Sequence, residues 1–148
     1  MTGEGWQWST LSRGEVRDRA REVVAGALER SGYSTTREGS IITAQGRGRA
    51  IEVHVRSLRK VTYQFWEKRR FDLAEGRYGA LVLLFDGQPP ASYLIPSLAW
   101  TSPTALLVDR NYEGLASEPE WGLNLSGRTL PTLDAYRLSV VLRTLDEL

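Results

Sequence analysis

The stretch Ala50-Ile-Glu-Val-His-Val-Arg-Ser57 is the most informative part of this chain about its fold. Three aliphatic residues alternate in it with three chemically active ones, and this two-residue period is typical of a strand with one buried face. On such a strand Glu52, His54 and Arg56 lie in one row on the same face. That row can bind a phosphate, hold a metal ion, carry out acid–base chemistry or form salt bridges on an exposed face.

The chain around this stretch has the composition of a globular protein. Its 148 residues are a typical length for one domain, so we expect a single domain over residues 1–148. Hydrophobic residues make up 41% and charged residues 25%, which excludes the disordered and fibrous classes. Disulfides, thiolate metal sites and cysteine nucleophiles are excluded because the chain has no cysteine.

The sequence also favours a cytoplasmic protein without a membrane partner. Nothing near the N-terminus resembles a signal peptide, and the longest apolar run, Ala80 to Phe85, is far too short to span a bilayer. The lack of cysteine is compatible with the cytoplasm.

Positive charge is concentrated around the opening stretch. Between Arg47 and Arg70 there are eight basic and two acidic residues, so this window carries +6, and the rest of the chain carries −5 because the net charge is +1. Such asymmetry indicates an anionic partner, for which nucleic acid, and DNA in particular, is the leading candidate. The predicted phosphate-binding residues are Arg47, Arg49, Arg56, Arg59, Lys60, Lys68 and Arg69.

Before the stretch, the sequence predicts a helix and two strands. Ser12 and Glu15 have the spacing of a capping box, and apolar residues recur at helical intervals until Gly32. Strands at 33–37 and 40–44, a hairpin turn at 45–48 and the strand at 50–57 then form a meander. Residues 1–11 are a lead-in whose Trp6 and Trp8 are expected to lie against the domain.

After the stretch, we expect a helix at about 65–74 and a central strand at 79–85 that is buried on both faces. Short strands are predicted at 92–95, 106–109 and 122–126, with an irregular connection at 113–119. A last helix begins at Thr129 or Pro131. Its predicted buried face consists of Leu133, Tyr136, Val140, Val141 and Leu145. The fold class is therefore α/β, and we find no internal repeat.

This order of elements resembles the core of the PD-(D/E)XK nuclease superfamily, which includes Holliday-junction resolvases. The resemblance covers about residues 12–100 and rests on the capped helix ending in Gly-Tyr, the Ile-x-Val-x-Val-Arg-Ser strand and the Ala80 to Phe85 strand. Segments 92–97 and 120–126, with Trp100, are similar to small bacterial members of the group. The resemblance implies a restriction-endonuclease-like mixed sheet flanked by helices, with residues 101–148 as a C-terminal extension ending in a helix.

The resemblance also implies a degenerate active site. In the family, a carboxylate in the second strand and an acid-x-Lys motif in the third hold Mg²⁺ beside the scissile phosphate. Here residues 41–44 contain no acid, and His54 and Arg56 occupy the positions of the acid and the lysine. The candidate catalytic residues are thus Glu52, His54, Arg56 and Glu15, and Glu52 and Glu15 become Mg²⁺ or Mn²⁺ ligands only if the protein is an enzyme.

Each of these residues also has a structural interpretation. Glu15 completes a capping box, His54 can be a buried structural imidazole, and Glu52 and Arg56 can each form a salt bridge with another element. For Phe65 and Trp66, core packing competes with stacking on unpaired bases.

Three hypotheses follow. The leading one is a nucleic-acid-binding domain without a cofactor, in a bacterial DNA-processing or defence system, a context that the resemblance alone implies. The second is an active metal-dependent endonuclease with a rearranged site, built from Glu15 and Glu52 with His54 or Lys68. The third is a protein-interaction or oligomerisation module that uses the Trp-rich ends of the chain.

Overall fold

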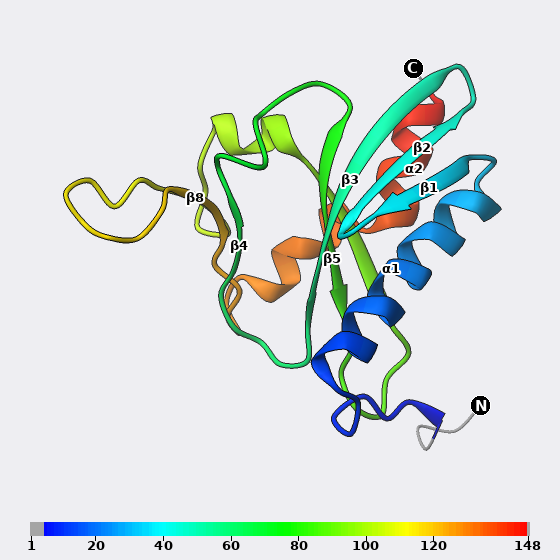
Figure 1. The fold of residues 1–148 in the computed structure, drawn as a ribbon, viewed down its shortest axis with the longest axis horizontal. Helices are drawn as coiled ribbons and strands as arrows, with labels where there is room; N and C mark the ends of the chain where they lie inside the picture. Colours follow the sequence, from blue (N-terminus) through cyan, green and yellow to red (C-terminus); the bar gives the residue numbers. More distant parts are fainter. Residues whose placement is uncertain (1–4, 148) are drawn as a thin grey trace.

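A mixed five-stranded sheet forms the centre of the computed structural model, which describes residues 5–147 (Figure 1). Residues 1–4 of the expected lead-in and residue 148 of the expected domain lie outside the described residues. The strand order is β1-β2-β3-β5-β6, in which β3 and β5 are parallel and the other neighbours are antiparallel. The strands are β1 (Ser34–Glu38), β2 (Ile41–Gly46), β3 (Arg49–Leu58), β5 (Arg77–Leu83) and β6 (Ala91–Pro96). The predicted α/β class and the predicted meander are confirmed.

Helix α1 (Arg13–Arg30) covers one face of this sheet. It begins with the predicted capping box, in which Ser12 Oγ accepts a hydrogen bond from Glu15 N at 3.1 Å and Glu15 Oε1 accepts one from Ser12 N at 3.0 Å. Its apolar side packs against the aliphatic residues of β3, which include Val53 and Val55. The lead-in lies against the same core, where Trp8 is buried and Trp6 is partly buried, as predicted.

Strand β3 is longer than its neighbour β2, and this leaves part of its edge open. The register pairs Ile41 at the start of β2 with His54, so residues 55–58 of β3 extend beyond that strand. Among the described residues, one further backbone hydrogen bond, from Val55 N to Ser40 O, continues the pairing on that side. On its other side β3 remains paired with β5 as far as Leu58.

The predicted helix at 65–74 is wrong, because the chain forms a strand and a series of turns there. Strand β4 (Gln64–Glu67) pairs with β8 (Glu120–Leu123), and β8 pairs with β7 (Leu107–Arg110), giving a second, three-stranded sheet. Tyr63, Phe65 and Trp66 are aromatic residues that favour a strand wherever another strand is available to pair. The pairing partner lies more than fifty residues further along the chain, so local periodicity could not reveal it.

The second sheet encloses a separate hydrophobic core on the face opposite α1 (Figure 1). Its centre is an aromatic group in which the Trp66 ring lies 5.5 Å from Trp100 and 5.9 Å from Phe71. Strand β5 is buried on both faces, as predicted, with Ala80 and Val82 in the first core and Leu81 in the second. The main sheet is therefore flanked by α1 on one face and by the small sheet on the other.

The C-terminal segment contains two helices where one was predicted. A 3-10 helix, η3 (Leu130–Tyr136), is followed by Arg137 in an extended conformation and then by α2 (Leu138–Asp146). This break shifts the buried face, so Leu138 and Leu142 are buried whereas Val140, predicted to be buried, is 37% exposed. Another 3-10 helix, η2 (Ser97–Thr101), follows β6. Strands β7 and β8 lie within two residues of their predicted starting points.

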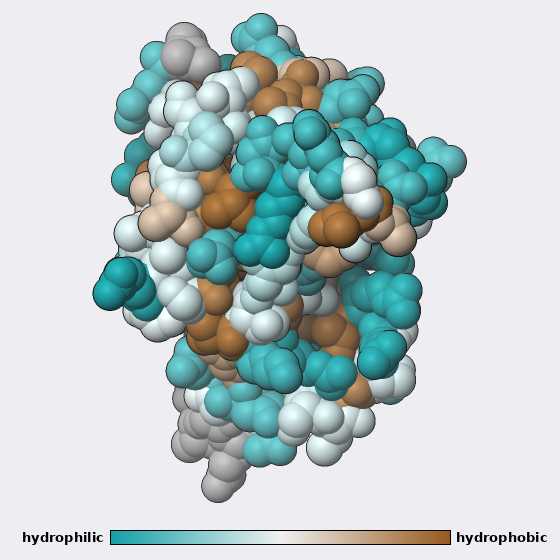
Figure 2. Space-filling view, turned by 90° about the vertical axis from the view of Figure 1, so that its left-hand side faces the viewer, coloured by the Kyte–Doolittle hydropathy of each residue, from teal (hydrophilic) through white to brown (hydrophobic). Residues whose placement is uncertain are grey.

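The face that carries β4 and β8 exposes hydrophobic side chains in several small patches separated by hydrophilic ones (Figure 2). Among residues 5–147, no helix combines the length and the apolar character needed to cross a membrane.

Candidate functional site

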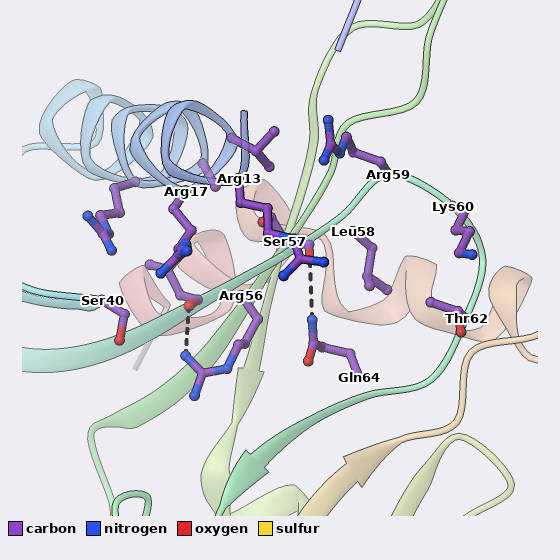
Figure 3. A pocket seen from close by; sticks show the side chains of 14 residues that line it. Arg13, Arg17, Ser40, Arg56, Ser57, Leu58, Arg59, Lys60, Thr62 and Gln64 are labelled. Carbon is purple, nitrogen blue, oxygen red and sulfur yellow. Dashed lines mark hydrogen bonds between the residues drawn. The ribbon is translucent and has the colours of Figure 1, made fainter. Parts of the chain in front are cut away.

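A groove of about 710 Å³ lies between the N-terminal half of α1 and the C-terminal end of β3 (Figure 3). The described residues that line it supply hydroxyl groups, aliphatic groups and many cations but no aspartate or glutamate. The six basic residues of the lining are Arg13, Arg17, Arg21, Arg56, Arg59 and Lys60. We refer to this site as the basic groove.

Helix α1 supplies one wall of the basic groove. Arg13, Arg17 and Arg21 are spaced four residues apart, and this spacing aligns side chains along one face of a helix. Arg21 forms an ion pair with Asp18 at 3.2 Å, whereas Arg13 and Arg17 form no ion pair within the described residues. These three arginines lie outside the window in which phosphate-binding residues were predicted, although their four-residue spacing is visible in the sequence.

Arg56 is held partly buried at the end of β3. Its Nη1 donates a hydrogen bond to Val55 O at 3.2 Å and its Nε donates one to Phe65 O at 3.3 Å, so backbone carbonyls position the guanidinium. Burial lowers the pKa of Arg56, and the charge of Glu67 opposes this shift only in part. No carboxylate contacts the guanidinium in the described structure, so an anion in the groove would compensate a cation that the protein leaves incompletely neutralised.

Arg59 has a structural role at the rim of the groove. Its Nη1 donates hydrogen bonds to the carbonyl oxygens of Trp8, Ser9 and Leu11 at 3.1, 3.4 and 2.8 Å. This one guanidinium therefore ties the lead-in to the end of β3, whereas the exposed Lys60 beside it has no carboxylate partner in residues 5–147.

Side chains cover the part of the β3 edge that β2 leaves open. Gln64 Nε2 donates a hydrogen bond to Ser57 O at 3.2 Å, and Arg56 Nη1 donates one to Val55 O (Figure 3). The hydroxyl-bearing residues Ser40, Ser57 and Thr62 line the groove beside this edge. Hydroxyl groups and arginines together are the side chains that commonly bind phosphate oxygens.

Glu52 and His54 share one face of β3, as predicted. His54 Nε2 lies 3.0 Å from Glu52 Oε2, and Arg77 Nε lies 2.5 Å from the same oxygen. The hydrogen bond from His54, and then the Arg77 guanidinium, lower the pKa of Glu52 although partial burial opposes the shift. His54 is only 6% exposed and its ring packs edge-on against Phe71. The core around Trp66 and Phe71 therefore covers His54, the middle residue of the row.

Glu15 does not join this row. It is exposed, its carboxylate caps α1, and the hydrogen bonds with Ser12 lower its pKa. Helix α1 packs on the face of β3 that carries Val53 and Val55, whereas Glu52 lies on the other face. Within residues 5–147 there is no group of three or more histidine, aspartate or glutamate side chains arranged to hold a metal ion.

The structure separates the seven basic residues that were predicted to bind phosphates. Arg56, Arg59 and Lys60 line the basic groove, and Arg49 lies elsewhere, at the start of β3. The other three have acidic partners, which are Asp146 at 2.7 Å for Arg47, Asp109 for Lys68 and Glu67 at 3.2 Å for Arg69. Lys68 also lies over the ring of Trp121, 4.0 Å from its centroid.

A second polar cluster joins β8 to the loop before β4. The buried Glu120 accepts hydrogen bonds from Tyr63 and, at 3.3 Å, from Tyr112. Burial, together with the Glu120 carboxylate, raises the pKa of Tyr63. Arg110 lies over the Tyr63 ring, 4.2 Å from its centroid. These contacts hold the small sheet together, and no local pattern in the sequence indicates them.

Comparison with known proteins gave no match, whether against family models, curated proteins or solved structures. The nuclease resemblance therefore stays a prediction, and the functional argument rests on the chemistry of the basic groove.

Proposed function

We propose that this protein is a nucleic-acid-binding domain whose basic groove binds backbone phosphates. The observation that carries the proposal is a concave site lined by six cations from α1, β3 and the segment after β3, with no acidic residue among its described lining residues. A site of one charge sign with partly desolvated walls concentrates ions of the opposite sign.

The kind of cation supports phosphate as the ligand. Five of the six basic side chains are arginines, whose planar guanidinium donates two parallel hydrogen bonds to phosphate oxygens. Arg13 and Arg17 are available for such contacts because they form no ion pair in the part of the chain that the structure describes. Ser40, Ser57 and Thr62 add neutral donors of the type found at phosphate contacts.

We further propose that the domain has a restriction-endonuclease-like core with a degenerate metal site. The order of a helix, an antiparallel meander and a strand parallel to β3 supports this assignment, although the crossover between β3 and β5 contains β4 where the family has a helix. The bacterial DNA-processing or defence context follows from the resemblance alone.

Two features favour binding over catalysis. Thr43, and no acid, lies opposite Glu52 in the register, and the Glu52 carboxylate already accepts hydrogen bonds from Arg77 and His54. The enzyme alternative requires this carboxylate to leave both partners and bind Mg²⁺ or Mn²⁺. Calorimetric titration of the protein with Mn²⁺ separates the two, because only the enzyme should show binding that Glu52→Gln abolishes.

The proposal is tested by measuring the binding of labelled oligonucleotides at several salt concentrations. The double variant Arg13→Ala, Arg17→Ala should bind more weakly at all sequences, and the slope of log affinity against log salt should fall in magnitude by about 1.4 to 1.8. The matched control is Arg37→Ala, Arg128→Ala, which removes the same charge from exposed positions outside the groove. Equal losses in both double variants would contradict the proposal, as would unchanged binding in the first.

A further inference from the structure

We propose that the basic groove accepts a single nucleic acid strand in preference to a duplex. This inference rests on the proposed function and concerns which form of nucleic acid the same site selects. It applies to single-stranded DNA and RNA alike, because the groups that carry it contact phosphates and base faces.

The shape of the site is the first argument. Proteins that read a duplex insert a protruding helix or ribbon into one of its grooves, whereas here the cations line a hollow in the protein. A volume of about 710 Å³ is within the roughly 300 to 1,000 Å³ typical of sites for small molecules. One strand can therefore enter between α1 and the segment after β3, while a duplex can contact only the rim.

The apolar part of the lining is the second argument. The aliphatic lining residue that keeps part of its surface exposed is Leu58 of β3, because Val16, Ala20 and Val55 are buried in the core beneath α1. A single strand offers an unpaired base face that can pack on Leu58, and phosphates that can meet the cations beside it. The bases of a duplex are stacked on one another, so its phosphate backbone would leave Leu58 without an apolar partner.

The length of the basic wall sets the size of the site. Arg13 and Arg21 are eight residues apart on α1, which corresponds to about 12 Å at about 1.5 Å per residue. Successive phosphates of one strand are at least about 3.4 Å apart. The groove can therefore contact no more than about four nucleotides, and longer strands should gain little further affinity.

The experiment compares the binding of labelled oligothymidylate and oligouridylate of 2, 4, 8 and 16 nucleotides with a blunt DNA duplex and a polyglutamate peptide at the same salt. We expect both single strands to bind at least tenfold more tightly than the duplex and the peptide. After division by the number of overlapping sites on each strand, the affinity should rise with strand length up to about four nucleotides and then level off.

The same assay compares two double variants, Arg13→Ala, Arg17→Ala in the groove and Arg37→Ala, Arg128→Ala outside it. We expect both to unfold at the temperature of the native protein, because all four arginines are exposed. Arg13→Ala, Arg17→Ala should lower the slope for single strands by about 1.4 and reduce their advantage over the duplex, whereas Arg37→Ala, Arg128→Ala should leave both unchanged. Equal or tighter duplex binding would overturn the inference and leave the proposed function standing. Polyglutamate binding as tight as that of the single strands would also overturn it. Failure of every nucleic acid to bind would overturn both.

Discussion

His54 Nε2 lies 3.0 Å from Glu52 Oε2, within the row of β3 that was predicted to be either a candidate catalytic or binding site or a face carrying salt bridges. Arg77, which pairs with Glu52 in the register of β3 and β5, approaches the same carboxylate oxygen. The carboxylate therefore links two central strands, and the salt-bridge interpretation of Glu52 is confirmed. Arg56 differs, because its described partners are carbonyl oxygens of Val55 and Phe65.

This arrangement predicts an acid-dependent contribution to stability. The folded-state pKa of Glu52 is lowered from its ordinary value of 4.5, so its ionised form stabilises the folded state above that value and the contribution is lost as the pH falls through the lowered pKa. Urea unfolding of the native protein and Glu52→Gln between pH 2 and 7 should show a difference near neutrality that disappears at the acid end. A difference that stays constant over this range would contradict the prediction.

Gly122 should not tolerate a side chain. A Cβ at this position would collide with Tyr63 Oη and lie 2.6 Å from Val108 Cγ2, so Gly122→Ala should lower the free energy of unfolding by about 1 to 3 kcal/mol. At Gly127 a Cβ would meet nothing within 4 Å, and Gly127→Ala should change it by no more than about 0.5 kcal/mol. Chemical denaturation of the two variants measures the contrast, and similar effects at both positions would refute it.

Arg59 should stabilise the lead-in as well as the charge of the groove. Arg59→Ala removes three hydrogen bonds from a cation to carbonyl oxygens, and we expect a loss of about 2 kcal/mol in the free energy of unfolding. Limited proteolysis should cut faster within residues 5–12. Arg59→Lys keeps the charge but not the geometry, so it should restore oligonucleotide binding more fully than stability. Unchanged proteolysis in Arg59→Ala would show that these contacts do not hold the lead-in.

The purified protein should show no robust Mg²⁺-dependent cleavage of duplex, single-stranded or branched DNA. Under the proposed nuclease-like alignment, Thr43 and His54 occupy the positions of the family's acids, and residues 5–147 contain no group of three or more histidine, aspartate or glutamate side chains arranged to hold Mg²⁺ beside a phosphate. The triple variant Thr43→Asp, His54→Glu, Arg56→Lys introduces the family's residue pattern and should gain weak activity if the backbone is nuclease-like. Cleavage by the native protein that Glu52→Gln abolishes would instead establish the rearranged enzyme.

Features that depend on neighbouring residues could be predicted from the sequence. The Ser12–Glu15 capping box, the alternation in β3 and the two-sided burial of β5 are all encoded within a few positions, and all three are confirmed. The helix expected at 65–74 failed because the strand that pairs with Trp66 comes from residues 120–123. Tertiary pairing overrides local preference in such cases.

The basic residues of the groove were predicted only in part, because some of them are distant in the sequence and are brought together by the fold. Charge was counted along a continuous window, which captured Arg56 and Lys60 but not Arg13 and Arg17 on the helix opposite them. The same count included Arg47, whose partner Asp146 is 99 residues away and could not be inferred from the sequence. A helical-face analysis of α1 would have shown the row of arginines, but only the fold brings that row to the end of β3.

Consecutive residues of β5 pack into different hydrophobic cores, since Leu81 belongs to the core around Trp66 and Val82 to the core beneath α1. The residues after Thr101 supply Leu107, Leu123 and Leu133 to the core around Trp66. These residues are therefore needed to complete the core around Trp66. A protein that ended at Thr101 would leave Leu81 and one side of its central strand exposed to solvent.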